Sequence, residues 1–141
     1  MATLGIDYGS RRIGIAVSAS DVLATPLTVV PNCGDLGETV ERIARLADEI
    51  GSVETFVVGI PRSSRRDAAE TERKFRELAE ALRQKTCKEV VLWDESYSTT
   101  EAASRRRESG KNWKSMKAEI DKEAAAVILQ SYLDEQSRKR S

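Results

Sequence analysis

The chain has 141 residues, 40% of them hydrophobic, and its 23 basic and 23 acidic side chains give a formal net charge of zero. This composition predicts one soluble domain that is large enough to bury a core and to carry an active site. The absence of histidine excludes a Ser-His-Asp triad, a Cys-His pair and a histidine-ligated zinc site. The two cysteines, Cys33 and Cys87, lie far apart, so neither a disulfide framework nor a thiolate metal site is expected.

No part of the sequence predicts export or membrane insertion. The N-terminus lacks the basic start and long apolar run of a signal peptide, and no stretch approaches the roughly 20 apolar residues that span a bilayer. We therefore expect a cytoplasmic protein with no membrane partner. Because the net charge is zero, a nucleic-acid partner would have to be bound by a local basic face.

The first thirty residues predict three extended segments. Alternating apolar residues indicate strands over 3–8 and 13–18, joined as a hairpin by a turn at Gly9 and Ser10. The run 23–30 indicates a third strand, and a proline near its start favours an early or edge position in the sheet.

Strands and helices alternate after this opening. Apolar residues at helical spacing predict a helix over 36–50, with Asp35 and Glu38 as a capping pair and Gly51 as its end. The remaining predicted elements follow in order: a buried strand over 55–60, a helix over 67–84, a short strand over 90–93, a helix that begins with the capping box at Ser98, a loop over 109–118 and a last helix over 121–136.

This order, three strands followed by alternating helices and strands, predicts an α/β fold with a mixed sheet covered by helices. The chain shows no internal repeat and no low-complexity linker. We expect one domain over 1–137, followed by a basic tail over 138–141.

Three separated acidic positions are candidates for chemistry. Asp7 lies within the first strand, where a buried carboxylate needs a cation or donors. The pair Asp94 and Glu95 follows the last strand, at the kind of edge where open sheets bind ligands, and Asp121 opens the last predicted helix. Each also has a structural interpretation: a turn acid, a solvated strand end and a helix N-cap, respectively.

Carboxylates from three segments can hold one or two Mg²⁺ or Mn²⁺ ions, because these hard cations prefer oxygen ligands. Such ions activate water and stabilise the oxygens of a phosphodiester during in-line displacement. This chemistry needs no histidine, so the composition is compatible with a metal-dependent nuclease.

Basic residues gather in two places that suit nucleic-acid binding. The first cluster follows the strand ending near Pro61, and the second extends from 102 to 117 with an aromatic residue within it. The candidate contacts are Arg65, Arg66, Arg105, Arg106, Lys111, Trp113 and Lys114. A solvated helix face and a loop are the alternative interpretation of these clusters.

The sequence also resembles a known family, the YqgF/RuvX proteins, to which Holliday junction resolution and pre-16S ribosomal RNA cleavage are ascribed. The resemblance covers residues 3–134 and rests on four motifs: LGIDYGSRRIGIAVS at the start, VVGIP at 57–61, LWDESYSTTEA at 92–102 and IDKEAAAVILQSYL at 120–133. It implies a ribonuclease H-like fold with a five-stranded mixed sheet, strand order 3-2-1-4-5, and an antiparallel second strand. It also implies that Asp7, Glu95 and Asp121 are the catalytic metal ligands.

Two departures from the family pattern lie beside this implied site. Ser96 stands where the family commonly has an arginine after the Asp-Glu pair. Ser63-Ser64-Arg65-Arg66 stands where the family usually has a loop that contains asparagine, aspartate and glycine.

The leading hypothesis is a Mg²⁺- or Mn²⁺-dependent endonuclease acting on structured nucleic acid, with ribosomal RNA precursors as first substrate and branched DNA as second. A nucleic-acid-binding or ribosome-associated module without catalysis is the alternative from another class. A third is an actin-like ATPase, because residues 5–10 also resemble a phosphate-binding hairpin, although 141 residues leave no room for the second domain that such proteins need. The oligomeric state, a homodimer included, stays open.

Overall fold

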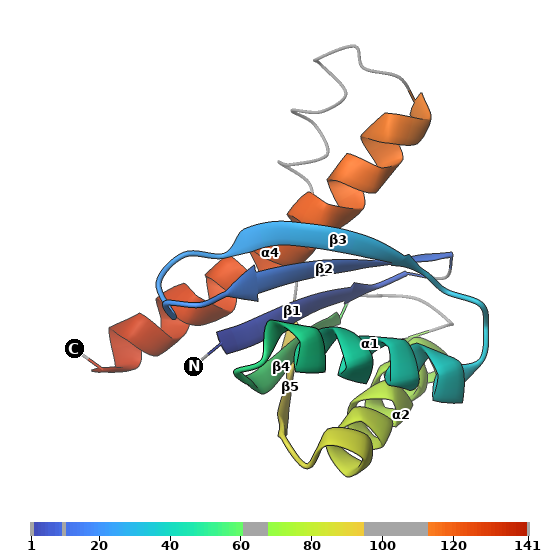
Figure 1. The fold of residues 1–141 in the computed structure, drawn as a ribbon, viewed down its shortest axis with the longest axis horizontal. Helices are drawn as coiled ribbons and strands as arrows, with labels where there is room; N and C mark the ends of the chain where they lie inside the picture. The colour runs from blue at the N-terminus through green and yellow to red at the C-terminus, as the bar shows by residue number, and fades with distance from the viewer. Residues whose placement is uncertain (1, 10, 61–67, 95–112, 141) are drawn as a thin grey trace.

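The computed structural model describes residues 2–9, 11–60, 68–94 and 113–140, and it describes their side chains except at positions 68, 69, 71, 113–121 and 140 (Figure 1). Within these residues the chain forms a five-stranded sheet and three helices. The strands are β1 (Ala2–Tyr8), β2 (Arg12–Ser18), β3 (Thr25–Pro31), β4 (Val53–Ile60) and β5 (Glu89–Asp94). The helices are α1 (Leu36–Ile50), α2 (Ala68–Thr86) and α4 (Trp113–Arg140).

The sheet has the strand order β3-β2-β1-β4-β5. Strand β2 is antiparallel to both β1 and β3, whereas β4 is parallel to β1 and β5 is parallel to β4. The predicted mixed sheet with order 3-2-1-4-5 is therefore confirmed. Pro26 lies in β3 at the edge of the sheet, as its missing amide proton predicts.

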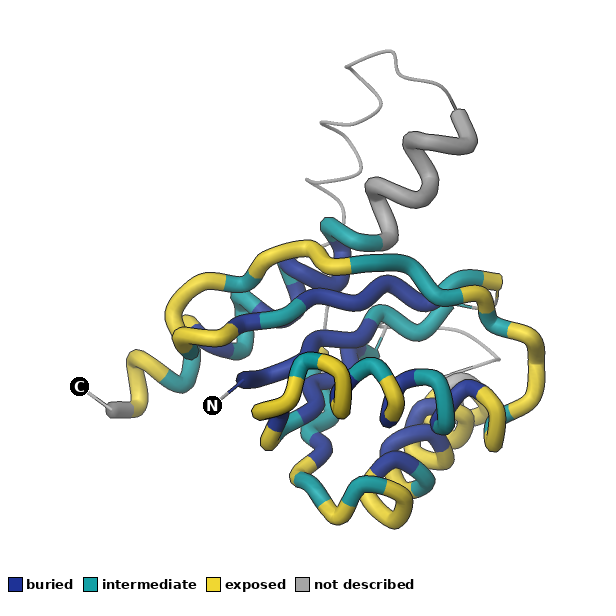
Figure 2. Tube along the Cα trace, in the orientation of Figure 1, coloured by how far each residue is buried: buried dark blue, intermediate teal, exposed yellow. Residues whose placement is uncertain are grey.

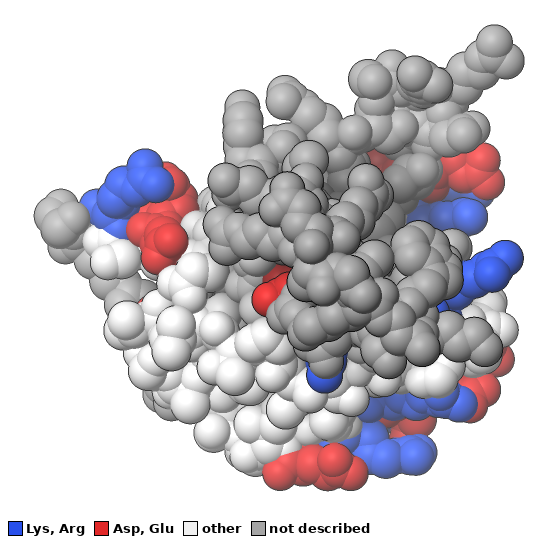
Figure 3. Space-filling model, turned by 90° about the horizontal axis from the view of Figure 1, so that it is seen from above, with Lys and Arg blue, Asp and Glu red and all other residues white. Residues whose placement is uncertain are grey.

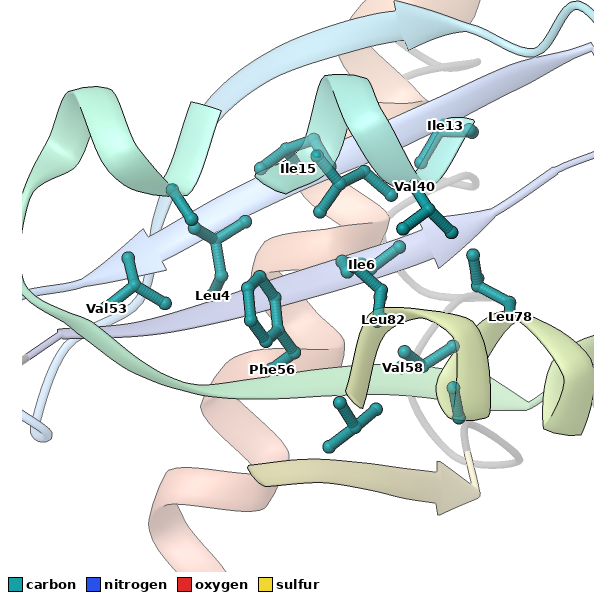
Figure 4. Packing of buried hydrophobic residues seen from close by; sticks show 14 of the residues in the cluster. Leu4, Ile6, Ile13, Ile15, Val40, Val53, Phe56, Val58, Leu78 and Leu82 are labelled. Carbon is teal, nitrogen blue, oxygen red and sulfur yellow. The ribbon is translucent and has the colours of Figure 1, made fainter. Parts of the chain in front are cut away.

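The helices cover the two faces of the sheet unequally. Helices α1 and α2 lie on one face and α4 crosses the other (Figure 1). The larger core lies under α1 and α2, where Leu4, Ile6 and Phe56 of the sheet meet Val40 of α1 and Leu82 of α2 (Figure 4). The smaller core joins the sheet to α4 and contains Ala16, Val57, Ala125, Ile128 and Leu129.

Burial follows this layered arrangement. The central strands are largely buried, and the exposed residues lie mainly on the outer faces of the helices, in the connections between elements and in part of β3 (Figure 2). Cys33 and Cys87 are both exposed, and they do not form a disulfide with each other. Within the described part of the chain, no helix has both the length and the apolar character needed to cross a bilayer.

Helix α1 has the ends that the sequence predicts. The Asp35 carboxylate accepts hydrogen bonds from the amides of Gly37 and Glu38, at 2.9 and 3.4 Å, and so caps the first turn. Gly51 adopts the left-handed conformation, with φ of 96°, and its amide bonds the carbonyl of Ala47 at 3.0 Å.

The last helix differs from the prediction. It begins at Trp113 and ends at Arg140, so the loop predicted over 109–118 is wrong from position 113 onward, and positions 138–140 of the predicted tail are helical. Asp121 therefore lies inside α4 and is not its N-cap. The physical reason is that 111–140 contains no glycine or proline and is rich in strong helix formers, although its first turns lack an apolar period.

The third strand also begins later than predicted, at Thr25, because the residues before it are bound to α4. The Gln130 side chain accepts a hydrogen bond from the amide of Ala24 at 2.9 Å and donates one to the carbonyl of Val22 at 2.8 Å. These two bonds hold the connection between β2 and β3 against the helix. The helix predicted to begin at Ser98 lies outside the described residues.

Candidate active site at the carboxyl edge of the sheet

Asp7 is the last residue but one of the central strand. Because β1, β4 and β5 are parallel, their carboxyl ends meet at one edge of the sheet, and Asp7 lies at this edge. Its cross-strand neighbours are Gly14 in β2 and Gly59 in β4, which have no side chains. The half-buried carboxylate thus has no neighbouring side chain from either of these two positions.

The alternation of β1 places Asp7 on the face that α4 covers. Leu4 and Ile6 point into the core under α1 and α2, so Gly5 and Asp7 face the other way. Gly5 provides direct evidence of this: a Cβ atom there would lie 2.7 Å from Leu129 Cβ and 3.0 Å from the carbonyl oxygen of Ala125. The missing side chain of Gly5 lets α4 pack closely against the strand that carries Asp7.

Helix α4 runs antiparallel to β1. Thr3 lines a cavity together with Leu133, near the C-terminal part of the helix, whereas Gly5 contacts Leu129 and Ala125 further toward its N-terminus. Continuing two residues along β1 leads to Asp7, and continuing one helical turn from Ala125 leads to position 121. The structure therefore brings the backbone of position 121 toward the Asp7 end of the sheet, while the Asp121 side chain lies outside the described residues.

Strand β5 distinguishes between the two neighbouring acids. Val90 is buried in the core under α1 and α2, and Leu92 packs against it, so Asp94 has the same parity and lies on the face opposite Asp7. Trp93 has the parity of Asp7: its indole N–H donates to Ser131 Oγ of α4 at 3.2 Å. Glu95 lies outside the described residues.

The residue types at this edge suit a hard divalent cation. Asp7 offers carboxylate oxygens beside two glycines, and the chain has no histidine to favour a softer metal. Among the described side chains, no three histidine, cysteine, aspartate or glutamate residues gather into a metal-binding group. In a site made of Asp7, Glu95 and Asp121, only the side chain of Asp7 is among the described residues.

Sequence reasoning did not single out the arginines of the hairpin between β1 and β2. Arg11 and Arg12 follow its turn at the same edge as Asp7. Asn32 holds this hairpin: its amide N–H donates to the carbonyl of Arg11 at 2.9 Å, and its side-chain Nδ2 donates to the carbonyl of Gly9 at 2.7 Å. Strand alternation, counted from Ile13 and Ile15, is the sequence signal that could have placed Arg12 on the face of the sheet opposite those two residues.

The predicted nucleic-acid contacts lie largely outside the described residues. This holds for Arg65, Arg66, Arg105, Arg106 and Lys111. Trp113 and Lys114 are in the first turn of α4, but their side chains are not described.

Charges on α1 and α2 are mainly paired. Exposed ion pairs one helical turn apart join Arg42 to Glu38 at 3.0 Å and Arg76 to Glu72 at 2.6 Å. Lys85 of α2 also contacts Glu41 of α1 at 2.8 Å, and this hydrogen bond is the main cause that lowers the pKa of Glu41 from its usual 4.5. In the view of Figure 3, the described basic and acidic side chains lie next to one another along the rim of the molecule. The paired charges of α1 and α2 are therefore more typical of a solvated helix face than of a phosphate-binding surface.

Solved structures with the same arrangement identify the fold. A chain described as "Thermus thermophilus RuvC structure" has a TM-score of 0.60 and 16% sequence identity, covering 98% of this chain and 97% of that one. The complex of T. thermophilus RuvC with a Holliday junction substrate matches with a TM-score of 0.55 and 17% identity, over 97% and 96% of the two chains. The chain thus has the ribonuclease H-like fold of RuvC.

Sequence comparison then gives the family. The family model described as "RuvX: Holliday junction resolvase" matches residues 1–135. A relative from Anaeromyxobacter sp., named "Putative pre-16S rRNA nuclease", is 42% identical over 137 residues, which cover 95% of this chain and 97% of the relative. A relative of the same name from Rhodococcus opacus is 39% identical over 139 residues, covering 96% of this chain and 78% of the relative. The chain belongs to the RuvX family.

Proposed function

We propose that this protein is a divalent-metal-dependent endonuclease that hydrolyses phosphodiester bonds in ribosomal RNA precursors. Two lines support this. Relatives about 40% identical over nearly the whole chain bear the name of a pre-16S rRNA nuclease. Asp7 lies at the carboxyl edge of the sheet, on the α4 face and between two glycines, and this position is the single observation that carries the proposed site.

Asp7, Glu95 and Asp121 would hold the Mg²⁺ or Mn²⁺. Asp7 is described, and position 121 lies one helical turn from the Ala125 contact with its strand. Glu95 is included because the family resemblance implies it; Trp93, two positions before it in the chain, packs on α4. When bound, the ion would activate a water and stabilise the leaving oxygen.

Three glycines without side chains shape the surroundings of Asp7. Gly5 lets α4 pack closely on β1, and so sets the distance between the two elements that carry Asp7 and position 121. Gly14 and Gly59, the cross-strand neighbours of Asp7, add no side chains of their own beside its carboxylate. Asp94, on the opposite face, is not part of the proposed set.

Cleavage of a pre-16S rRNA fragment tests the proposal. The wild-type protein, Asp7→Asn and Asp94→Asn would be assayed with Mg²⁺, with Mn²⁺ and with EDTA. We expect cleavage by the wild type with either metal, and a loss of at least about a hundredfold in Asp7→Asn, because a lost transition-state contact of about 2.7 kcal/mol has this effect. Asp94→Asn removes the same charge on the other face and should cleave normally.

A four-way DNA junction in the same assay tests the second candidate. The RuvC fold and the family description favour this substrate, and preferential cleavage of the junction would replace RNA by branched DNA in the proposal. If Asp7→Asn cleaves as fast as the wild type, the assigned site is wrong. If the wild type binds RNA yet cleaves neither substrate in any metal, a non-catalytic module is the better description.

A further inference from the structure

Arg12 is the first residue of β2 and lies beside Asp7 on the same face of the sheet. Asp7 pairs with Gly14, so Arg12 is its diagonal neighbour on the adjacent strand, at a typical separation of about 7–8 Å that long side chains can bridge. Gly14, directly opposite Asp7, carries no side chain of its own. Ile13 and Ile15 are fully buried on the other face, which fixes the orientation of Arg12.

The residues further along β2 confirm which face this is. Ala16 has the parity of Gly14 and Arg12, and it is buried with Ala125 and Leu129 of α4. Arg12 itself is half-buried at the strand start. It therefore shares the α4 face with Asp7, whereas Asp94 and the arginines of α1 lie on the other face.

The backbone that carries Arg12 is fixed in place. The Gly9 amide donates to the Arg12 carbonyl at 3.0 Å, and a Cβ atom on Gly9 would lie only 2.5 Å from that oxygen, so this turn requires glycine. Asn32 binds both sides of the turn through Gly9 and Arg11, and its own Oδ1 accepts from the Gly34 amide at 3.0 Å. Such a constrained strand end limits the conformational entropy that Arg12 loses on binding.

We infer that Arg12 binds a phosphate of the RNA strand next to the proposed site at Asp7, and so sets the position of that strand. The inference rests on the proposed function, because it assumes that a nucleic-acid strand lies at this edge. A phosphodiester that approaches carboxylates needs a cationic partner, and the planar guanidinium is suited to bind two phosphate oxygens at once. The turn of the hairpin, which Gly9 and Asn32 hold, positions this cation at the start of β2.

The test is the salt dependence of binding to a pre-16S rRNA fragment in EDTA, where metal-dependent cleavage cannot occur. The logarithm of the binding constant falls linearly with the logarithm of the salt concentration, and the loss of one phosphate contact makes this slope shallower by about 0.7–0.9. We expect this lower slope in Arg12→Gln, with affinity at low salt about tenfold weaker, as for a lost hydrogen bond to a charged group. Arg12→Lys should keep the wild-type slope but bind severalfold more weakly, since it retains the charge and loses the fork.

Arg42→Gln is the matched control, because it removes one exposed positive charge from α1 on the opposite face. Its slope should equal that of the wild type. An Arg12→Gln variant with the slope of Arg42→Gln overturns the inference. If Arg12→Gln fails to fold by circular dichroism, Arg12→Lys decides: weaker binding at unchanged slope supports the inference, and wild-type affinity overturns it.

The cleavage assay separates this inference from the proposed function. If Asp7→Asn is inactive while Arg12→Gln binds with an unchanged salt slope, only the role of Arg12 is wrong. If Asp7→Asn cleaves normally, the proposed site is wrong, and a reduced slope in Arg12→Gln then indicates a binding surface alone.

Discussion

Gly5 is the residue through which α4 sets its distance from the strand that carries Asp7, and Gly5→Ala tests this role. Carbon atoms in contact are optimally about 3.5–4.0 Å apart, whereas the new Cβ would lie 2.7 Å from Leu129 Cβ and 3.0 Å from a backbone oxygen. The helix must therefore move by about 1 Å to restore an ordinary contact.

The cost of this movement can be estimated. Overpacking a core by a methyl group costs about 1–3 kcal/mol, and the lower entropy of the unfolded alanine chain returns about 0.4–1 kcal/mol. The expected net loss is about 1–2 kcal/mol of unfolding free energy, which corresponds to a melting temperature lower by about 3–8 °C for a domain of this size. Cleavage should fall more than stability predicts, because the shift separates the elements that carry Asp7 and Asp121.

Urea denaturation measures the loss of unfolding free energy, and RNA cleavage measures the loss of activity. Both are measured at a temperature below the melting transition of the variant. Gly37→Ala is the control: its Cβ would meet Asp35 Oδ1 at 3.4 Å, an ordinary contact, and alanine favours the first turn of α1. This control should be at least as stable as the wild type and equally active. A Gly5→Ala variant with wild-type stability and activity would refute the close packing of α4 on β1.

Two further predictions concern α1. The Thr39 hydroxyl is buried and has no hydrogen-bond partner among the described residues, so Thr39→Val should raise the unfolding free energy by about 1 kcal/mol; a lower melting temperature would contradict this. Lys85 lowers the pKa of Glu41, so the Glu41 carboxylate binds a proton less readily in the folded state than in the unfolded state. The ion pair therefore stabilises the fold above pH 4.5, and this effect is lost as the pH falls through the lowered pKa. Glu41→Gln should therefore melt slightly below the wild type at pH 7 in low salt, and the difference should vanish on acidification or in 1 M salt.

The sheet could be predicted from sequence because its strands carry local signals. Alternation in β1 and β2, the proline in β3 and the short apolar runs of β4 and β5 each indicate an element, and the family resemblance supplies their order. Helix α1 was predicted to the residue, since Asp35 and Gly51 mark both ends with side-chain and backbone chemistry.

The start of α4 could not be predicted from apolar periodicity. Residues 113–118 lack an apolar stripe, so periodicity favoured a loop, and only the absence of glycine and proline pointed to a helix. The same missing stripe makes Asp121 look like the start of the helix, and so allows the alternative interpretation of Asp121 as an N-cap. The face of Asp94 follows from alternation within β5 only once its buried side is known. The proximity of Arg12 to Asp7 depends in addition on the pairing register of β1 and β2, which alternation within either strand does not specify.

The contact between Gly5 and α4 has a consequence for how this sequence can change in length. Inserting one residue between positions 121 and 125 would rotate the upstream helix by about 100° and extend it by about 1.5 Å. Position 121 would then leave the row of Ala125 and Leu129, which the strand holds in place. We therefore expect that insertions or deletions between positions 121 and 125 would disrupt the site, whereas substitutions that keep the helix would leave the place of position 121 unchanged.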